Sequence, residues 1–159
     1  MAFLFGIKKY KSTPMRKIKM CLLGIICFAG VHAQSTQFTN KDGVAIKGYD
    51  PVAYFTLQKA IEGTDKYSFD WNGSKWKFIS QANVDSFKIA PEKYAPQYGG
   101  FCAYGTSENH LSPTDPNAWT IVDNKLYLNY NMNVKQMWLK DTTKRISAAD
   151  AYWPALKNQ

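Results

Sequence analysis

The sequence predicts an α+β fold, in which hairpins form a small antiparallel sheet and short helices pack on it. Two observations support this class. Asn72-Gly73 and Asp123-Asn124-Lys125 each lie between apolar segments of strand length, as in β-hairpins. The segments that follow each hairpin carry apolar residues at helical spacing and are short. The class therefore combines two hairpins with several short helices.

The first hairpin and its flanking segments are expected between residues 49 and 91. Val52–Phe55 is apolar and short, and we interpret it as a strand. Tyr67–Trp71 alternates apolar and polar residues, and Trp76–Ile79 is the returning strand across Asn72-Gly73. Ser80 has the character of an N-cap for a helix over 81–89, which Pro91 would end.

The second half is predicted in the same way. Residues 92–98 suggest a short helix that Gly99-Gly100 interrupts, and 109–116 is expected to be a loop. Trp119–Val122 and Leu126–Tyr130 form the second hairpin. Helices are expected over 134–140 and 146–156. The sequence shows no internal repeat, linker or low-complexity tract.

Residues 1–33 have the three parts of a cleavable signal peptide. A basic segment begins at Met15, which is also a candidate start, an apolar run follows over 21–30, and Val31-His32-Ala33 is a cleavage site. The apolar run is shorter than the roughly 20 residues that a membrane-spanning helix needs. We therefore expect an exported protein, periplasmic or extracellular, without a stable membrane anchor after cleavage, and a single domain over 34–159.

Removal of this segment changes the charge and the cysteine count. Six of the 20 Lys and Arg residues precede residue 34, so 14 remain against 12 Asp and Glu, a net charge of +2. This small charge does not suggest nucleic-acid binding. Cys21 and Cys27 leave with the segment, so Cys102 has no partner for an intrachain disulfide.

Cys102 and His110 are the candidate metal ligands, because no other cysteine or histidine follows residue 33. Copper or zinc would suit a thiolate and an imidazole. The spacing matches no standard zinc motif, and a closed site would need further ligands. The alternative is structural: Cys102 would be a small buried residue beside two glycines, and His110 a solvated loop residue.

Two further segments are candidates for binding a small ligand. Tyr98, Gly99, Gly100 and Tyr104 surround Cys102 in a run where glycines allow close approach and tyrosines supply hydroxyl groups. Tyr49 and Asp50 form the other segment. Asp50 precedes a proline and is interpreted as ordering a turn, with a buried pocket acid as the alternative. Core packing is the alternative for the glycines and tyrosines.

These segments together resemble the YHS domain family, in its exported single-domain subgroup. The core of the resemblance covers residues 45–95, with Gly48-Tyr49-Asp50-Pro51-Val52-Ala53-Tyr54-Phe55, Trp76-Lys77-Phe78-Ile79 and Pro91-Glu92-Lys93-Tyr94. It continues through Tyr98-Gly99-Gly100-Phe101-Cys102 to Trp153-Pro154. The resemblance implies an association with heavy-metal handling. The thiolates of metal-binding relatives are absent, since Ala53, Ile79 and Asn83 stand at or near their positions, and Cys102 lies elsewhere.

The leading hypothesis is an exported, non-enzymatic domain that binds a small ligand or a copper-like metal ion near Cys102. No phosphate-binding loop, zinc-protease motif or paired-carboxylate motif is found in the sequence. One alternative is a thiol-dependent redox enzyme using Cys102, which would need a base nearby. Another is a protein-interaction module.

Overall fold

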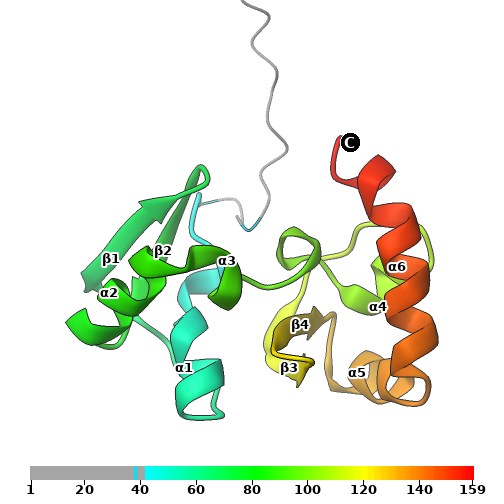
Figure 1. Ribbon diagram of the computed structural model, residues 1–159, viewed down its shortest axis with the longest axis horizontal. Coiled ribbons are helices and arrows are strands. Elements are labelled where there is room, and N and C mark those ends of the chain that lie inside the picture. Colours follow the sequence, from blue (N-terminus) through cyan, green and yellow to red (C-terminus); the bar gives the residue numbers. More distant parts are fainter. Residues whose placement is uncertain (1–37, 39–41) are drawn as a thin grey trace, which may run out of the picture. The chain divides into compact units, whose positions relative to one another are not determined.

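The order turn, helix, hairpin, helix, helix occurs twice in the described part of the chain (Figure 1). The computed structural model describes residue 38 and residues 42–159. The expected signal peptide therefore lies outside the described residues. Among the described helices, none has both the length and the apolar character needed to cross a bilayer.

Each half contains a short 3-10 turn (η), a helix, two strands and two helices. The first half comprises η1 (Ile46–Gly48), α1 (Pro51–Thr56), β1 (Thr64–Trp71), β2 (Ser74–Phe78), α2 (Gln81–Ile89) and α3 (Pro91–Tyr94). The second half comprises η2 (Tyr98–Gly100), α4 (Ala103–Ser107), β3 (Asp115–Val122), β4 (Lys125–Asn129), α5 (Met132–Leu139) and α6 (Thr142–Leu156). We call residues at the same place in the two halves counterparts.

The two hairpins match strand for strand. In the first, Trp71 pairs with Ser74 next to the turn and Thr64 pairs with Phe78 at the far end. In the second, the same places are taken by Val122 with Lys125 and Asp115 with Asn129. Both hairpins also have an irregular register just after the first residue of the leading strand. This shared irregularity indicates one supersecondary unit used twice.

The turns that open the two halves share an unusual backbone. Ile46, Lys47 and Gly48 have φ angles of 40°, 55° and 86°. Tyr98, Gly99 and Gly100, their counterparts, have φ angles of 53°, 60° and 79°. Left-handed backbone is costly for residues other than glycine, and most of all for a β-branched one. The buried side chains of Ile46 and Tyr98 anchor the two turns and offset this cost.

Each hairpin leads into a helix with a side-chain cap. Ser80 accepts the backbone N–H of Asn83 at the start of α2, as predicted. Asn131 accepts the backbone N–H of Val134 at the start of α5. The prediction of a strand over Val52–Phe55 is wrong, because these residues lie in α1. Asp50 as N-cap and Pro51 at the first helical position are both helix-start signals.

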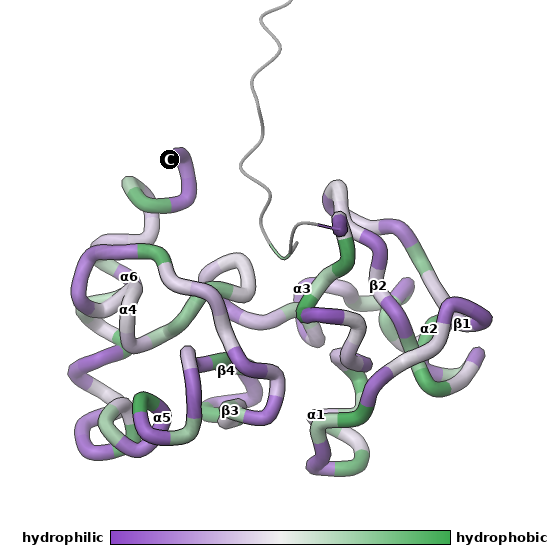
Figure 2. Tube along the Cα trace, turned by 180° about the vertical axis from the view of Figure 1, so that it is seen from behind, coloured by the Kyte–Doolittle hydropathy of each residue, from purple (hydrophilic) through white to green (hydrophobic). Residues whose placement is uncertain are grey.

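Two apolar clusters share strand β4. Leu126 and Leu128 pack into the larger cluster, which includes Trp76, Phe78 and Phe87 of the first half. Tyr127, between the two leucines, packs into the smaller cluster with Tyr98 and Trp138. Successive side chains of a strand point to opposite faces, so β4 has apolar residues on both. Figure 2 accordingly shows short hydrophobic stretches spread over both halves.

The α+β class is confirmed, although the two hairpins form separate two-stranded sheets. The sequence shows no internal repeat, and residue identities in the two halves indeed differ. The structure repeats its elements, turns, strand register and caps with different side chains. The helix α4 and the strand that begins at Asp115, within the expected loop over 109–116, were also not predicted.

Candidate functional site

The structure separates the predicted binding residues into different surroundings. Tyr49 and Asp50 lie at the start of the first half, and Tyr98 to Tyr104 lie at the corresponding place in the second half. Cys102, Tyr104 and His110 line one pocket. Gly99 and Gly100 line another. The seven predicted ligand-binding residues therefore do not surround a single cavity.

Asp50 is a buried carboxylate whose two oxygens are fully engaged. Oδ1 accepts the backbone N–H groups of Val52 (2.8 Å) and Ala53 (3.2 Å) at the start of α1. Oδ2 accepts the backbone N–H of Ile79 (2.9 Å) and the side-chain Nδ2–H of Asn83 (2.6 Å). Asp50 thus caps α1 and joins it to the residues between β2 and α2. With four donors on two oxygens, little capacity is left for a ligand.

Cys102 is the counterpart of Asp50 and occupies the same kind of place. Its side chain is buried, and it is the N-cap of α4. Sγ accepts the backbone N–H groups of Gly105 (3.4 Å) and Tyr130 (3.2 Å). These two residues are the counterparts of Ala53 and Ile79, which bind Asp50 through the same backbone groups. Cys102 therefore makes two of the four contacts that Asp50 makes.

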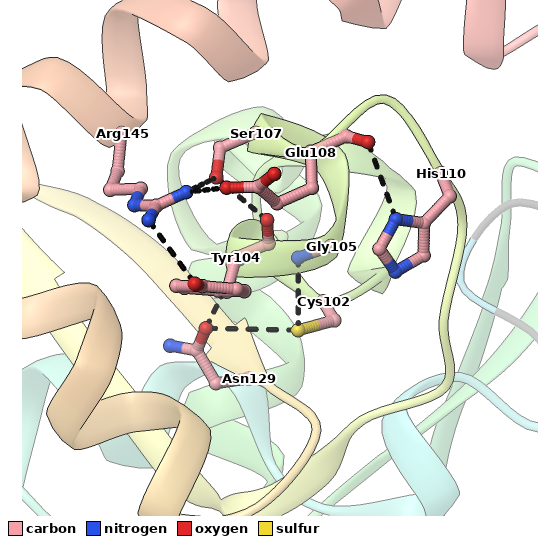
Figure 3. A network of polar contacts seen from close by, with 8 residues as sticks. All are labelled: Cys102, Tyr104, Gly105, Ser107, Glu108, His110, Asn129 and Arg145. Atoms are coloured by element: carbon pink, nitrogen blue, oxygen red, sulfur yellow. Dashed lines mark hydrogen bonds and ion pairs between the residues drawn. The ribbon is translucent and has the colours of Figure 1, made fainter.

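Asn129 supplies a third contact of this set. The backbone N–H of Tyr104, counterpart of Val52, donates to Asn129 Oδ1 at 3.2 Å instead of to the capping residue. This contact fixes the orientation of the amide, and Cys102 Sγ lies 3.8 Å from the same oxygen (Figure 3). Asn129 is fully buried, and its Nδ2 has no partner among the described residues. A cysteine and an asparagine together thus replace one carboxylate.

The fourth contact has no equivalent. Asn83 donates its side-chain amide to Asp50. The counterpart of Asn83 is Val134, which follows its N-cap at the same distance and has no side-chain donor. Val134 instead lines a pocket of about 250 Å³ beside the sulfur. The other lining residues are Cys102, Tyr104, Gly105, His110, Ser112 and Tyr130.

The His110 ring is oriented by the backbone of the loop that carries it. Nδ1 lies 3.4 Å from the carbonyl oxygen of Glu108, the contact drawn in Figure 3. A proton on Nδ1 would be donated to this carbonyl, which leaves the Nε2 lone pair free for a ligand. His110 is exposed, whereas Cys102 is buried. The pocket therefore has a soft sulfur in its wall and an imidazole in contact with solvent.

Gly105 makes room for this imidazole. The residue is in α4 with φ outside the left-handed region, so its backbone does not require glycine. A Cβ at this position would lie 3.1 Å from His110 Nε2 and 3.2 Å from Ser112 Oγ. Glycine inside a helix costs about 1 kcal/mol relative to alanine. The space gained allows the ring to lie close to the turn of α4 that follows Cys102.

Arg145 of α6 holds the outer wall of the pocket. Its guanidinium lies over the Tyr104 ring, 4.1 Å from the centroid, and donates to the Tyr104 hydroxyl at 3.1 Å. It also donates to Ser107 Oγ at 3.2 Å and pairs with the Glu108 carboxylate. Figure 3 shows these groups on one side of α4 and His110 on the other. Arg145 thus fixes both Tyr104 and the residue whose carbonyl contacts His110.

Tyr98 is part of the core rather than of the pocket. It is buried, and its hydroxyl donates to Asp150 at 2.8 Å. Burial, followed by this carboxylate, raises the pKa of Tyr98 above its ordinary value. Burial also raises the pKa of the neighbouring Tyr127 to about 12. Both hydroxyl groups therefore stay protonated at neutral pH.

Gly99 and Gly100 line a second pocket, of about 220 Å³. The backbone N–H of Phe38 donates to the Gly99 carbonyl, at 2.6 Å, on one side of this pocket. Ser112 lines both pockets, and its carbonyl accepts the backbone N–H of Cys102 at 3.0 Å. Tyr49 lies outside both and packs against the larger apolar cluster.

Sequence reasoning missed Gly105, Ser112, Asn129, Tyr130 and Val134 as members or supports of this site. The spacing from Cys102 to Gly105 is that of an N-cap and its third helical residue, a signal that could have located α4. No such signal marks Asn129 or Val134, because their roles depend on the second hairpin. In comparisons with known proteins, no family model, curated protein or solved structure matches the chain.

Proposed function

We propose that the protein binds one soft metal ion, copper(I), between the Cys102 sulfur and the His110 imidazole. The observation that carries the proposal is that these two side chains, separated by seven residues in the sequence, line the same pocket. Thiolate and imidazole are ligands that copper(I) favours. We further propose that this occurs in an exported YHS-type domain, with residues 1–33 acting as the signal.

The donor set suits copper(I) more than zinc. Structural zinc sites have four ligands, usually cysteine and histidine. Among the described residues, no group of three or more His, Cys, Asp or Glu side chains is arranged to hold a metal ion. A two-donor set is sufficient for copper(I), which is stable with two ligands. The other polar side chains of the pocket, Tyr104, Ser112 and Tyr130, carry hydroxyl groups rather than thiolate or imidazole donors.

The surroundings of the sulfur support a bound cation. Binding requires the thiol to lose its proton, which leaves a negative sulfur. The N–H groups of Gly105 and Tyr130 already point at Sγ and would stabilise that charge. The Glu108 carbonyl orients the imidazole from the opposite ring nitrogen, an outer contact typical of metal-bound histidine.

A competition titration tests the proposal. Purified protein is titrated with copper(I) against a chromogenic chelator under anaerobic, reducing conditions, and Cys102→Ser and His110→Gln are compared with the exposed control Asn109→Gly, which suits the left-handed backbone at that position. Serine keeps an acceptor for the two N–H groups, so the fold is retained. We expect one copper per chain and losses of affinity above about 100-fold for both Cys102→Ser and His110→Gln, because mutating even an outer-shell partner of a metal ligand costs about 10–100-fold. Unchanged affinity in Cys102→Ser would refute the site.

A thiol-dependent redox function is a second candidate, favoured by the two N–H groups that contact the sulfur. No other cysteine follows residue 33, so an external thiol would have to complete the cycle. Alkylation of metal-free protein by iodoacetamide distinguishes the two. If His110 acts as a base, His110→Gln slows alkylation, whereas the copper proposal leaves the rate unchanged.

The interaction-module alternative rests on exposed apolar residues next to the pocket. Tyr130, Met132, Met137 and Leu139 are each at least 40% exposed. Such residues can meet a partner surface. Sedimentation at increasing protein concentration, with and without copper, tests whether this segment joins two copies of the chain.

A further inference from the structure

The two halves contain the same capping site, which is filled by four donors at Asp50 and borders a pocket at the buried Cys102. At Asp50, the side chain of Asn83 contributes the fourth donor and lies 2.6 Å from Oδ2. At Cys102, the counterpart side chain is Val134, which contributes no donor and lines the pocket. The backbone around both positions is equivalent, since Ser80 and Asn131 cap their helices through the N–H groups of Asn83 and Val134.

The two forms share two of their four donors and differ in the other two. Ile79 and Tyr130 donate their backbone N–H groups to the capping residue in both halves. Ala53 and Gly105 do the same from the first turn of the helix. The N–H of Tyr104, counterpart of Val52, donates to Asn129 instead. The donor on α2, Asn83, is replaced on α5 by Val134, which lines the pocket beside the sulfur. An amide at that place would compete with any ligand for the sulfur.

We infer that Val134 is the residue that keeps the Cys102 sulfur open to a ligand, and that an asparagine at this position closes the site. The inference rests on the proposed function for the identity of the ligand, but the accessibility of the sulfur is independent of it. Val134 acts on the ligand through the sulfur and the pocket wall, so it is a positioning residue rather than a ligand. Its half-buried position at the start of α5 places it at the edge of the pocket.

The test measures accessibility and affinity in Val134→Asn and Val134→Ala. Asparagine is compatible with this helix position, because Asn83 occupies the counterpart position in α2. Accessibility is the rate at which methyl methanethiosulfonate labels Cys102 in metal-free protein, followed by mass spectrometry. Affinity is measured with copper(I) alone. We expect Val134→Asn to slow labelling and weaken copper binding by about 10-fold each, the value of one hydrogen bond, and Val134→Ala to label at least as fast as the wild type.

The outcomes separate this inference from the proposed function. Slow labelling of Val134→Asn in a protein that binds no copper supports the inference and refutes the function. Copper binding by the wild type, with equal labelling rates in both variants, refutes the inference and keeps the function. If Val134→Asn fails to fold, the isosteric Val134→Thr replaces it, because its hydroxyl supplies a donor. Labelling of Val134→Thr slower than that of the wild type, whose valine has the same shape, then supports the inference, and equal rates overturn it.

Discussion

Replacement of Asp50 by asparagine tests the role of the closed cap in stability. The carboxylate accepts four hydrogen bonds, two on each oxygen. Whichever way the new amide is oriented, one of these oxygens becomes an NH₂ group that faces two donors. If the NH₂ replaces Oδ2, Asn83 can rotate and present its own oxygen, but the N–H of Ile79 stays without an acceptor. If it replaces Oδ1, the N–H groups of Val52 and Ala53 both lose theirs.

The magnitude follows from the hydrogen bonds that the substitution removes or weakens. A hydrogen bond to a charged acceptor contributes about 1.5–3 kcal/mol, and a buried donor left unpaired costs about 1–3 kcal/mol. After the rotation of Asn83, one such hydrogen bond is absent and the remaining ones are weaker because the acceptor is neutral. We therefore expect Asp50→Asn to lower the free energy of unfolding by about 2–4 kcal/mol, a large share of the 5–15 kcal/mol typical of a domain.

The assay is urea denaturation followed by tryptophan fluorescence, with Asp65→Asn as the matched control. Asp65 is an acid of the same half whose side chain is 75% exposed and pairs with Lys77. Exposed pairs contribute at most about 1 kcal/mol, so the control should change little. A loss below about 1 kcal/mol for Asp50→Asn, or a loss equal to that of the control, would contradict the role given to this cap.

Three further predictions concern the site and its supports. Gly105→Ala adds a Cβ 3.1 Å from His110 Nε2, so the ring must move and copper(I) binding should weaken about 10-fold. The NMR signals of the His110 ring in metal-free protein should therefore shift, and unchanged signals would contradict this prediction. Arg145→Gln removes the interactions with Tyr104 and Glu108 and should lower the free energy of unfolding by about 1–2 kcal/mol, whereas Lys144→Gln on the same helix should not. Burial raises the pKa of Tyr127 to about 12, against 10.0 in the unfolded chain, so its contribution to stability is complete below pH 10 and is lost as the pH rises from 10 to 12. The free energy of unfolding of Tyr127→Phe should therefore fall less steeply with pH in this range than that of the wild type. An identical pH profile would refute this role of the hydroxyl.

Local signals in the sequence were sufficient for much of the fold. The Asn72-Gly73 turn and the Ser80 cap locate the first hairpin and α2, because both signals act over a few residues. α1 was misassigned because Val52–Phe55 is apolar and too short for its periodicity to distinguish a strand from a buried helix. There the capping residue and the proline at the first helical position were the stronger signals.

The repeat could not be seen in the sequence because its counterparts differ in chemical type. Asp50 corresponds to Cys102. Asp50 accepts the N–H of Val52, whereas the N–H of its counterpart Tyr104 is accepted by Asn129. What the halves share is backbone geometry, such as the left-handed turns at Ile46 and Tyr98. Hydrogen bonding to backbone groups constrains the shape and polarity of a side chain more than its identity. A carboxylate, or a sulfur with an amide, can therefore satisfy similar donors.

The candidate site was predictable in part. Cys102 and His110 attract attention as the only cysteine and histidine after residue 33, but their proximity depends on the loop after α4, whose His110 N–H donates to the Gly105 carbonyl at 3.1 Å, and on the space that Gly105 leaves. The inferred access of a ligand to the sulfur depends on Val134, which lines the same pocket but is distant in sequence and chemically inconspicuous. Val134 lacks a side-chain donor, and this difference can be recognised only by comparison with its counterpart Asn83, which donates to Asp50.

Native mass spectrometry of the purified protein, prepared without chelator or affinity metal and then given one equivalent of copper(I), tests the binding proposal most directly. We predict a single added copper in the wild type that is lost in Cys102→Ser and retained in Asn109→Gly. A mass that stays free of metal in the wild type, or a copper adduct that persists unchanged in Cys102→Ser, would contradict a copper site at Cys102 and His110.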